Sequence, residues 1–161
     1  PSWFKEGMAM KNSNEFSLLH KIEISRYIWK KQTIPLLRLR NISQYSIDKV
    51  KLAYGESAAA IEALKSFYGD DILTKIITNL YQTQDFIEAL ELAIGEEFID
   101  FQIKFEQYME SNFKWIFLLR ASKYIYVMLP LVLVLGYIYR YYRSKQILSK
   151  WEVEEELDNI E

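Results

Sequence analysis

SIDKVKLAYGESAAAIEALKSFY, residues 46–68, is the stretch of sequence that decides the fold. Apolar or small side chains recur along it at steps of three and four residues, a spacing that keeps them on one side of an α-helix. These positions are Ile47, Val50, Tyr54, Ser57, Ile61, Leu64 and Tyr68. Gly69 follows directly, and a glycine commonly ends a helix at this point. We therefore predict a long helix over 46–68 with one side buried in a core.

The same periodicity predicts shorter helices on both sides of this stretch. Upstream, a helix opens the chain at Pro1, a second runs from Glu15 to Lys31, and a connector covers Thr33 to Tyr45. Downstream, Asp70 and Asp85 are expected to cap two further helices. The residues expected to be buried by these helices are Phe16, Leu19, Tyr27, Ile28, Ile72, Leu73, Ile76, Ile77, Leu80, Phe86, Ala89, Leu90, Ala93, Phe98, Phe101, Phe105 and Tyr108. No clear strand pattern and no internal repeat accompany them, so the sequence predicts an all-α fold.

The composition limits the possible classes of function. The chain has 161 residues, no cysteine and a single histidine, His20. Disulfides and cysteine-based zinc or redox centres are therefore excluded, and no site that needs two histidines can be built from these residues alone. The net charge of −2 gives no sign of a nucleic-acid partner. Because the chain begins with Pro1 rather than methionine, we expect it to be a processed form or a fragment.

An uncharged apolar run, YIYVMLPLVLVLGYIY, occupies residues 124–139. It is slightly shorter than the ~20 apolar residues that span a bilayer, but Lys123 and Arg140 flank it and tyrosines cluster at both ends. We expect a single transmembrane helix at 124–142 with the lipid bilayer as partner. A buried core helix is the alternative. The denser basic cluster after the run favours a cell-membrane protein with a cytoplasmic tail and an extracytoplasmic N-terminal domain.

These expectations divide the chain into four parts. Residues 1–113 would form the helical domain and 114–123 a juxtamembrane segment. The transmembrane helix at 124–142 would follow, and 143–161 would be a charged tail. The tail ends in WEVEEELDNIE, which is acidic and predicts a solvated helix.

The opening helix, PSWFKEGMAM, has a carboxylate on a largely apolar face. Glu6 lies three or four residues from Trp3 and Met10, and such residues are neighbours on a helix surface. Burying a carboxylate is costly unless a basic group, a water or a metal ion compensates it. Two interpretations stay open, a partly exposed Glu6 beside Lys5 or a Glu6 that binds a cation.

Four motifs follow one another in the chain: WFKEGMA at 3–9, AYGES at 53–57, FYGDDIL at 67–73 and DFIEALELAIG at 85–95. In this order they resemble the gluzincin metallopeptidases, and most closely the bacterial peptidase MA-like proteins. Gluzincins are zinc enzymes that combine an HExxH helix with a downstream glutamate as third ligand. The resemblance covers nearly the whole chain. It implies the helical C-terminal subdomain of a gluzincin-like peptidase, followed by a single transmembrane helix.

The resemblance also implies roles for individual residues. Glu6 would be the third zinc ligand, and Gly7 would permit close helix packing beside the metal. Tyr54 would stabilise the oxyanion, as a tyrosine does in aminopeptidase N-like enzymes. That tyrosine lies in a Y-x-K-G-like sequence, and AYGES has Glu56 and Ser57 where the lysine and glycine would stand, so a core role for Tyr54 stays open. Zinc polarises the scissile carbonyl and lowers the pKa of a bound water, and the implied activity is hydrolysis of peptide or protein substrates.

The chain departs from the family in one decisive respect, because it lacks the HExxH helix. His20 follows Glu6 and has no partner histidine, so we expect it on a partly exposed helix face rather than at a metal. Without two ligands and the general base, the chain alone should neither bind catalytic zinc tightly nor hydrolyse peptides. We therefore expect the C-terminal fragment of a membrane-anchored zinc metallopeptidase, which binds zinc only with an upstream HExxH segment. The alternatives are a non-enzymatic single-pass membrane helical subunit for assembly or partner binding, and a degenerate peptidase fold retained for binding.

Overall fold

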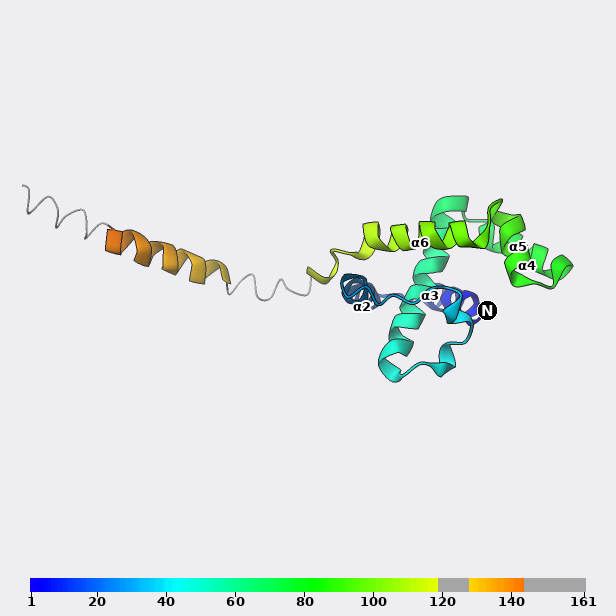
Figure 1. The fold of residues 1–161 in the computed structure, drawn as a ribbon, viewed down its shortest axis with the longest axis horizontal. Helices are drawn as coiled ribbons and strands as arrows, with labels where there is room; N and C mark the ends of the chain where they lie inside the picture. Colours follow the sequence, from blue (N-terminus) through cyan, green and yellow to red (C-terminus); the bar gives the residue numbers. More distant parts are fainter. Residues whose placement is uncertain (119–127, 144–161) are drawn as a thin grey trace, which may run out of the picture. The chain divides into compact units, whose positions relative to one another are not determined.

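A computed structural model describes residues 1–118 and 128–143 of the chain (Figure 1). Within these two ranges the regular structure is helical and contains no strand. The chain divides into two compact units, Pro1–Arg120 and Ala121–Glu161, and each is described separately. The predicted all-α class is thus confirmed for the described residues.

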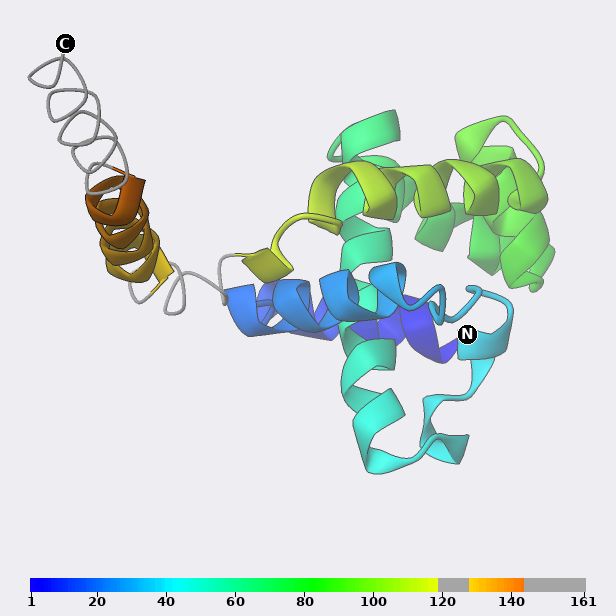
Figure 2. The same cartoon turned by 60° about the vertical axis from the view of Figure 1, so that its left-hand side comes forward.

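One long central helix, α3 (Ile47–Tyr68), organises the first unit, as Figures 1 and 2 show. The other elements of this unit are α1 (Ser2–Asn12), α2 (Leu18–Trp29), η1 (Arg38–Arg40), η2 (Ile42–Gln44), α4 (Ile72–Thr83), α5 (Phe86–Ile94) and α6 (Phe98–Phe113). Helices α1, α2, α4 and α6 all pack against α3, α1 most extensively, while α5 pairs with α4. The middle of α3 is rich in alanines, which are completely buried and let neighbouring helices approach closely.

Helix ends follow the capping chemistry that the sequence indicated. The Asp85 carboxylate accepts hydrogen bonds from the backbone N–H groups of Ile87 and Glu88, at 2.8 and 3.0 Å, and so opens α5. Gly69 follows α3 with a φ of +91°, in the region that side chains with a Cβ avoid. One expected cap is wrong by a residue, because α4 begins after Asp71 rather than Asp70.

Three apolar residues predicted to be buried are exposed instead. Leu19 is 73% exposed, Ile77 38% and Ile47 81%. Leu19 lies in the first turn of α2 and Ile47 in the first turn of α3, where the helices extend beyond the core. A three-to-four spacing identifies the face of a helix, but it does not tell where along the helix the core ends.

The connector before α3 contributes more to the core than its sequence suggested. Ile34, Leu36, Leu39 and Ile42 are all buried in it. Leu39 lies in the short 3₁₀ turn η1 and Ile42 in η2, whereas Ile34 and Leu36 precede both turns. The connector is therefore part of the hydrophobic core of the domain.

The predicted transmembrane helix at 124–142 is wrong. Within residues 1–118 and 128–143, no helix is long and apolar enough to cross a membrane. The described part of the helix in this region covers 128–143 and includes Arg140 and Arg143, whereas a span needs ~20 predominantly apolar residues. Positions 124–127 and the predicted tail after 143 lie outside the described residues.

Candidate functional site

A cavity of about 490 Å³ brings together the two residues that the motifs singled out. Glu6 reaches it from α1 and Tyr54 from α3, and the side chain of His20 joins them from α2. The full lining is Glu6, Ala9, Met10, Ser13, Glu15, His20, Lys51 and Tyr54. Residues nearly fifty positions apart in the chain thus face one space that contains carboxylate, imidazole, phenol and ammonium groups.

The crossing of α1 and α3 fixes Glu6 beside Tyr54. A Cβ atom added to Gly7 would lie 2.4 Å from the carbonyl oxygen of Ser57 and 2.8 Å from Cγ1 of Ile61. The two helix backbones therefore meet at Gly7 with no room for a side chain. The close helix packing expected at Gly7 is thus present, while a metal beside it stays a prediction.

Glu6 is a half-buried carboxylate without a protein partner. Within the part of the chain that the structure describes, it has no hydrogen bond and no ion pair, and Lys5 beside it is exposed and forms none with it. Trp3 and Met10 on the same helix are buried. A carboxylate so placed can accept a ligand cation or a hydrogen-bond donor from the cavity.

Tyr54 contacts both the hydrophobic core and the cavity, the two environments that the sequence left open for it. Its ring is half-buried and packs against the hydrophobic core, while the residue also lines the cavity. A tyrosine held in this way has a fixed ring and a hydroxyl group that can donate a hydrogen bond to a ligand.

His20 was expected on a partly exposed helix face, and the structure places it, half-buried, on the same cavity as Glu6. The backbone N–H of Ser17 donates to Nδ1 of His20 at 3.4 Å, and the Ser17 hydroxyl lies 3.2 Å from the same nitrogen. Because Nδ1 is an acceptor, the neutral ring carries its proton on Nε2. Helix α2 packs on α3 beside Gly55, where an added Cβ would lie 3.6 Å from Cβ of His20, an ordinary van der Waals distance. No sequence signal placed this histidine on the cavity of Tyr54, because its position depends on how α2 packs on α3.

The described residues do not form a complete metal site. In residues 1–118 and 128–143, no group of three histidines, cysteines, aspartates or glutamates could hold a metal ion. Glu6 has the right donor chemistry for one zinc ligand, since carboxylate oxygens bind zinc in hydrolytic sites. The remaining ligands of such a site would have to come from residues other than these.

A buried carboxylate that the motifs did not indicate, Glu56, lies two residues after Tyr54 on α3. Glu56 is fully buried, and both of its oxygens accept the backbone N–H of Ile34 at 3.1 Å. It therefore ties the connector to α3. The sequence did contain a signal, because the residues three and four positions away from Glu56 on either side are all apolar: Leu52, Ala53, Ala59 and Ala60.

Burial raises the pKa of Glu56 well above the usual value of 4.5, the N–H of Ile34 opposes that rise, and the negative charge of Glu106 adds to it. A raised folded-state pKa means that the folded protein holds this proton more tightly than the unfolded chain does. Protonated Glu56 therefore contributes fully to the free energy of unfolding below pH 4.5. This contribution is lost as the pH rises towards and through the raised pKa of the folded protein.

We expect Glu56→Gln to remove this loss, so that the variant gains stability over the wild type as the pH rises. Urea unfolding of both proteins between pH 4.5 and 8 measures the difference. Glu106→Gln should also reduce the loss of stability with rising pH, but by less, because the charge of Glu106 raises the pKa of Glu56 less than burial does. Parallel pH profiles of wild type and Glu56→Gln would contradict the assignment.

Comparisons with protein-family models, with curated proteins and with solved structures find no match to this chain. The likeness to gluzincins therefore rests on the motifs at 3–9, 53–57, 67–73 and 85–95. The activity, the metal and the residue roles that it implies are proposals.

Proposed function

We propose that this chain is the helical C-terminal part of a zinc-dependent metallopeptidase of the gluzincin type, with Glu6 as the third zinc ligand. The observation that carries the proposal is the unpartnered, half-buried carboxylate of Glu6 on the same cavity as Tyr54. An HExxH helix, which residues 1–161 do not contain, would supply two histidine ligands and the general base.

Zinc, when bound, supplies an activated water and a Lewis acid for the scissile carbonyl. The residues of this chain have three tasks around it. Glu6 holds the metal through its carboxylate. Tyr54 donates its hydroxyl proton in a hydrogen bond to the oxygen that becomes negative as the peptide bond is attacked. His20 offers Nε2–H as a second donor to groups of the substrate in the same cavity.

The nature of the cavity supports a peptide or protein substrate. A peptide backbone has both donors and acceptors, and the lining offers carboxylates at Glu6 and Glu15 and donors at His20, Lys51 and Tyr54. Met10 and Ala9 provide an apolar side for a substrate side chain. The volume of about 490 Å³ lies in the range of small-molecule and peptide side-chain pockets.

Zinc retention tests the proposal in the protein that carries the upstream HExxH helix. Glu6→Gln should lower zinc affinity by more than ~100-fold, because even the loss of an outer-shell partner costs 10–100-fold. Equilibrium dialysis against a zinc buffer measures the affinity directly and does not depend on turnover.

Glu15→Gln is the matched control, since Glu15 lines the same cavity but is exposed and is not proposed as a ligand. It should keep zinc within about threefold of the wild type, well inside the effect of losing one ligand. Equal zinc affinity of Glu6→Gln and Glu15→Gln would reject Glu6 as a ligand. A protein in which no HExxH segment precedes Pro1 would favour the non-enzymatic helical subunit.

A further inference from the structure

An exposed aromatic surface lies where the end of α2 meets the segment after α6. We call it the tryptophan face and define it as Trp29, Lys114, Trp115, Phe117 and Leu118. Trp29 is 46% exposed, Trp115 61% and Leu118 44%, although residues of this kind usually lie inside a domain. No residue of the face lines the cavity of Glu6, and the proposed peptidase chemistry does not use the face.

The rings of this face are held rigidly. Trp29 packs edge-on against Trp115 at 5.2 Å and against Phe117 at 5.6 Å between ring centroids. The indole N–H of Trp29 donates to the carbonyl oxygen of Lys114 at 2.6 Å. Because the polar group of this indole is already satisfied by protein, its exposed edge is apolar.

A buried serine fastens the segment after α6 to α2. The hydroxyl of Ser25 donates to the carbonyl oxygen of Lys114 at 2.8 Å and accepts the backbone N–H of Phe117 at 3.0 Å. The aromatic rings are therefore ordered before any partner binds, which lowers the entropy lost on binding.

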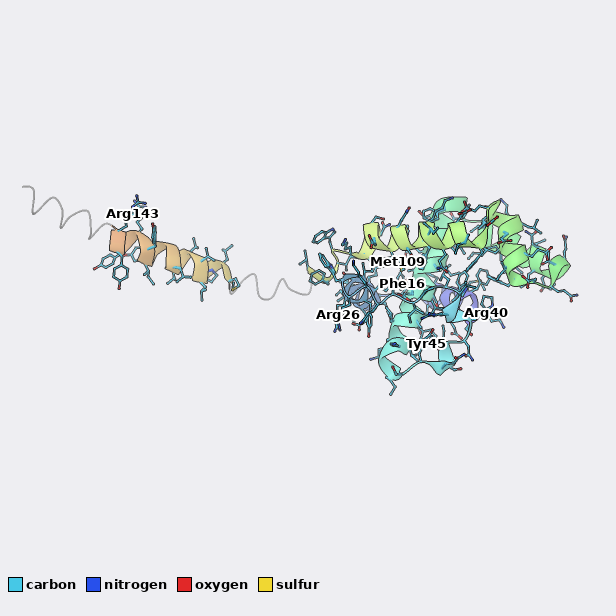
Figure 3. All side chains as sticks on the ribbon, viewed as in Figure 1. Phe16, Arg26, Arg40, Tyr45, Met109 and Arg143 are labelled. Atoms are coloured by element: carbon cyan, nitrogen blue, oxygen red, sulfur yellow. The ribbon has the colours of Figure 1, made fainter. Side chains whose placement is uncertain are left out.

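Several basic residues adjoin this apolar surface. Lys114 lies 5.4 Å from the ring centroid of Trp29, and Lys30 and Lys31 follow Trp29 directly and are exposed. Arg26, labelled in Figure 3, lies one turn earlier on α2 and pairs with Glu23 at 3.1 Å. Glu110, one turn before Lys114, is the nearest acid on α6.

The sequence continues the same charge pattern beyond this point. Residues 111–151 contain no aspartate or glutamate, and their basic residues are Lys114, Arg120, Lys123, Arg140, Arg143, Lys145 and Lys150. Exposed indoles need an apolar partner, and the neighbouring lysines need a negatively charged one. A surface that is anionic outside and apolar beneath provides both. An anionic lipid bilayer has this layering, because tryptophan favours the headgroup level and basic residues favour anionic lipids.

We propose that the tryptophan face docks the domain peripherally on an anionic membrane surface. Contact of this kind buries the exposed edges of Trp29 and Trp115 among the headgroups and leaves the lysines beside lipid phosphates and carboxylates. It requires no helix that crosses the membrane. It is also independent of the proposed metallopeptidase activity.

Partition of the whole chain into vesicles tests the proposal. The vesicles contain phosphatidylcholine alone or with phosphatidylserine at about 3:1, an anionic surface of the cytoplasmic-leaflet kind. Lys30→Gln combined with Lys114→Gln should weaken binding to the anionic vesicles by about 30-fold, since each basic residue contributes ~1 kcal/mol and 1.4 kcal/mol is tenfold. Binding to neutral vesicles should stay unchanged. The matched charge control, Lys5→Gln with Lys49→Gln, removes two exposed lysines elsewhere and should have little effect.

The aromatic part of the face has its own test. Trp115→Ala should weaken partition at least about tenfold through lost apolar burial, whereas Tyr81→Ala, which removes an aromatic residue that is 83% exposed on α4, should not. Quenching by brominated lipid, taken as the difference between wild type and Trp115→Phe, reports this ring alone. It stays informative if the helix at 128–143 also binds lipid.

Three results would overturn the proposal. One is equal weakening by the tryptophan-face and control variants, and another is no quenching of Trp115 on bound vesicles. The third is a change of oligomeric state in Trp115→Ala with vesicle binding unchanged, which would assign the face to contact between copies of the chain.

Discussion

Gly7→Ala is expected to lower the free energy of unfolding by about 3 kcal/mol, the upper end of the usual cost of overpacking. The added methyl group would lie 2.4 Å from the Ser57 carbonyl oxygen and 2.7 Å from its carbon. Both atoms belong to the backbone of α3, so no side-chain rotation can relieve the clash. The helices α1 and α3 must move apart, and the apolar contacts on both sides of the crossing are then lost.

Gly55→Ala is the matched control, because it makes the same chemical change in a helix that packs less tightly at that point. The nearest atoms to its added methyl group would be side-chain carbons of Ile24 at 3.4 Å and Cβ of His20 at 3.6 Å. This is ordinary van der Waals contact, so the helix propensity of alanine should stabilise the variant by up to ~1 kcal/mol. Thermal and urea unfolding should therefore show opposite changes in the free energy of unfolding for the two variants. A Gly7→Ala protein as stable as Gly55→Ala would show that α1 and α3 do not meet as described.

If Tyr54 has the proposed oxyanion role, Tyr54→Phe should reduce kcat by on the order of 100-fold, the usual cost of removing one oxyanion donor. The substitution removes only the hydroxyl group and keeps the ring that packs against the core. KM and zinc affinity should change little, because the hydroxyl would act on the transition state rather than on the bound peptide or the metal. The measurement is peptide hydrolysis by the protein that includes the HExxH helix.

Tyr45→Phe controls for the loss of a tyrosine hydroxyl elsewhere in the domain. Its hydroxyl donates to the carbonyl oxygen of Arg38 at 3.0 Å and does not line the cavity of Glu6. Turnover by this variant should stay within about twofold of the wild type, because it makes no contact with the proposed transition state. A Tyr54→Phe enzyme with the same kcat as Tyr45→Phe would leave Tyr54 as a core residue alone.

The helices were predictable where their apolar spacing was regular and their ends carried caps. Ile61 and Leu64 in α3 and Phe101 and Phe105 in α6 are buried as their spacing predicted. The connector was not predictable, because its buried residues follow no single period, and the two short 3₁₀ turns contain only Leu39 and Ile42 of them. The transmembrane helix was not predicted correctly: within residues 1–118 and 128–143 no helix is both long and apolar enough to cross a membrane, although an uncharged run does identify apolar sequence.

The candidate site was predictable only in part. Glu6 and Tyr54 could be selected because each belongs to a motif, and the structure brings both to one cavity. Their chemical roles stay predictions. His20 could not be joined to them from sequence, because its position depends on the packing of α2 against Gly55. Glu56 could have been found, because a carboxylate whose helical neighbours are all apolar must be buried or bound.

The central position of α3 has a consequence for how the cavity moves. Its walls come from α1, α2 and α3, and the first two both pack on the third. Local opening of any wall must therefore break contacts with the same helix, so the three walls belong to one cooperative unit of unfolding. Slow fluctuations of the cavity are then tied to the global stability of the domain. A wider or more flexible cavity would therefore have to evolve through changes in the loops around it, because weakening the helix packing would lower the stability of the whole domain.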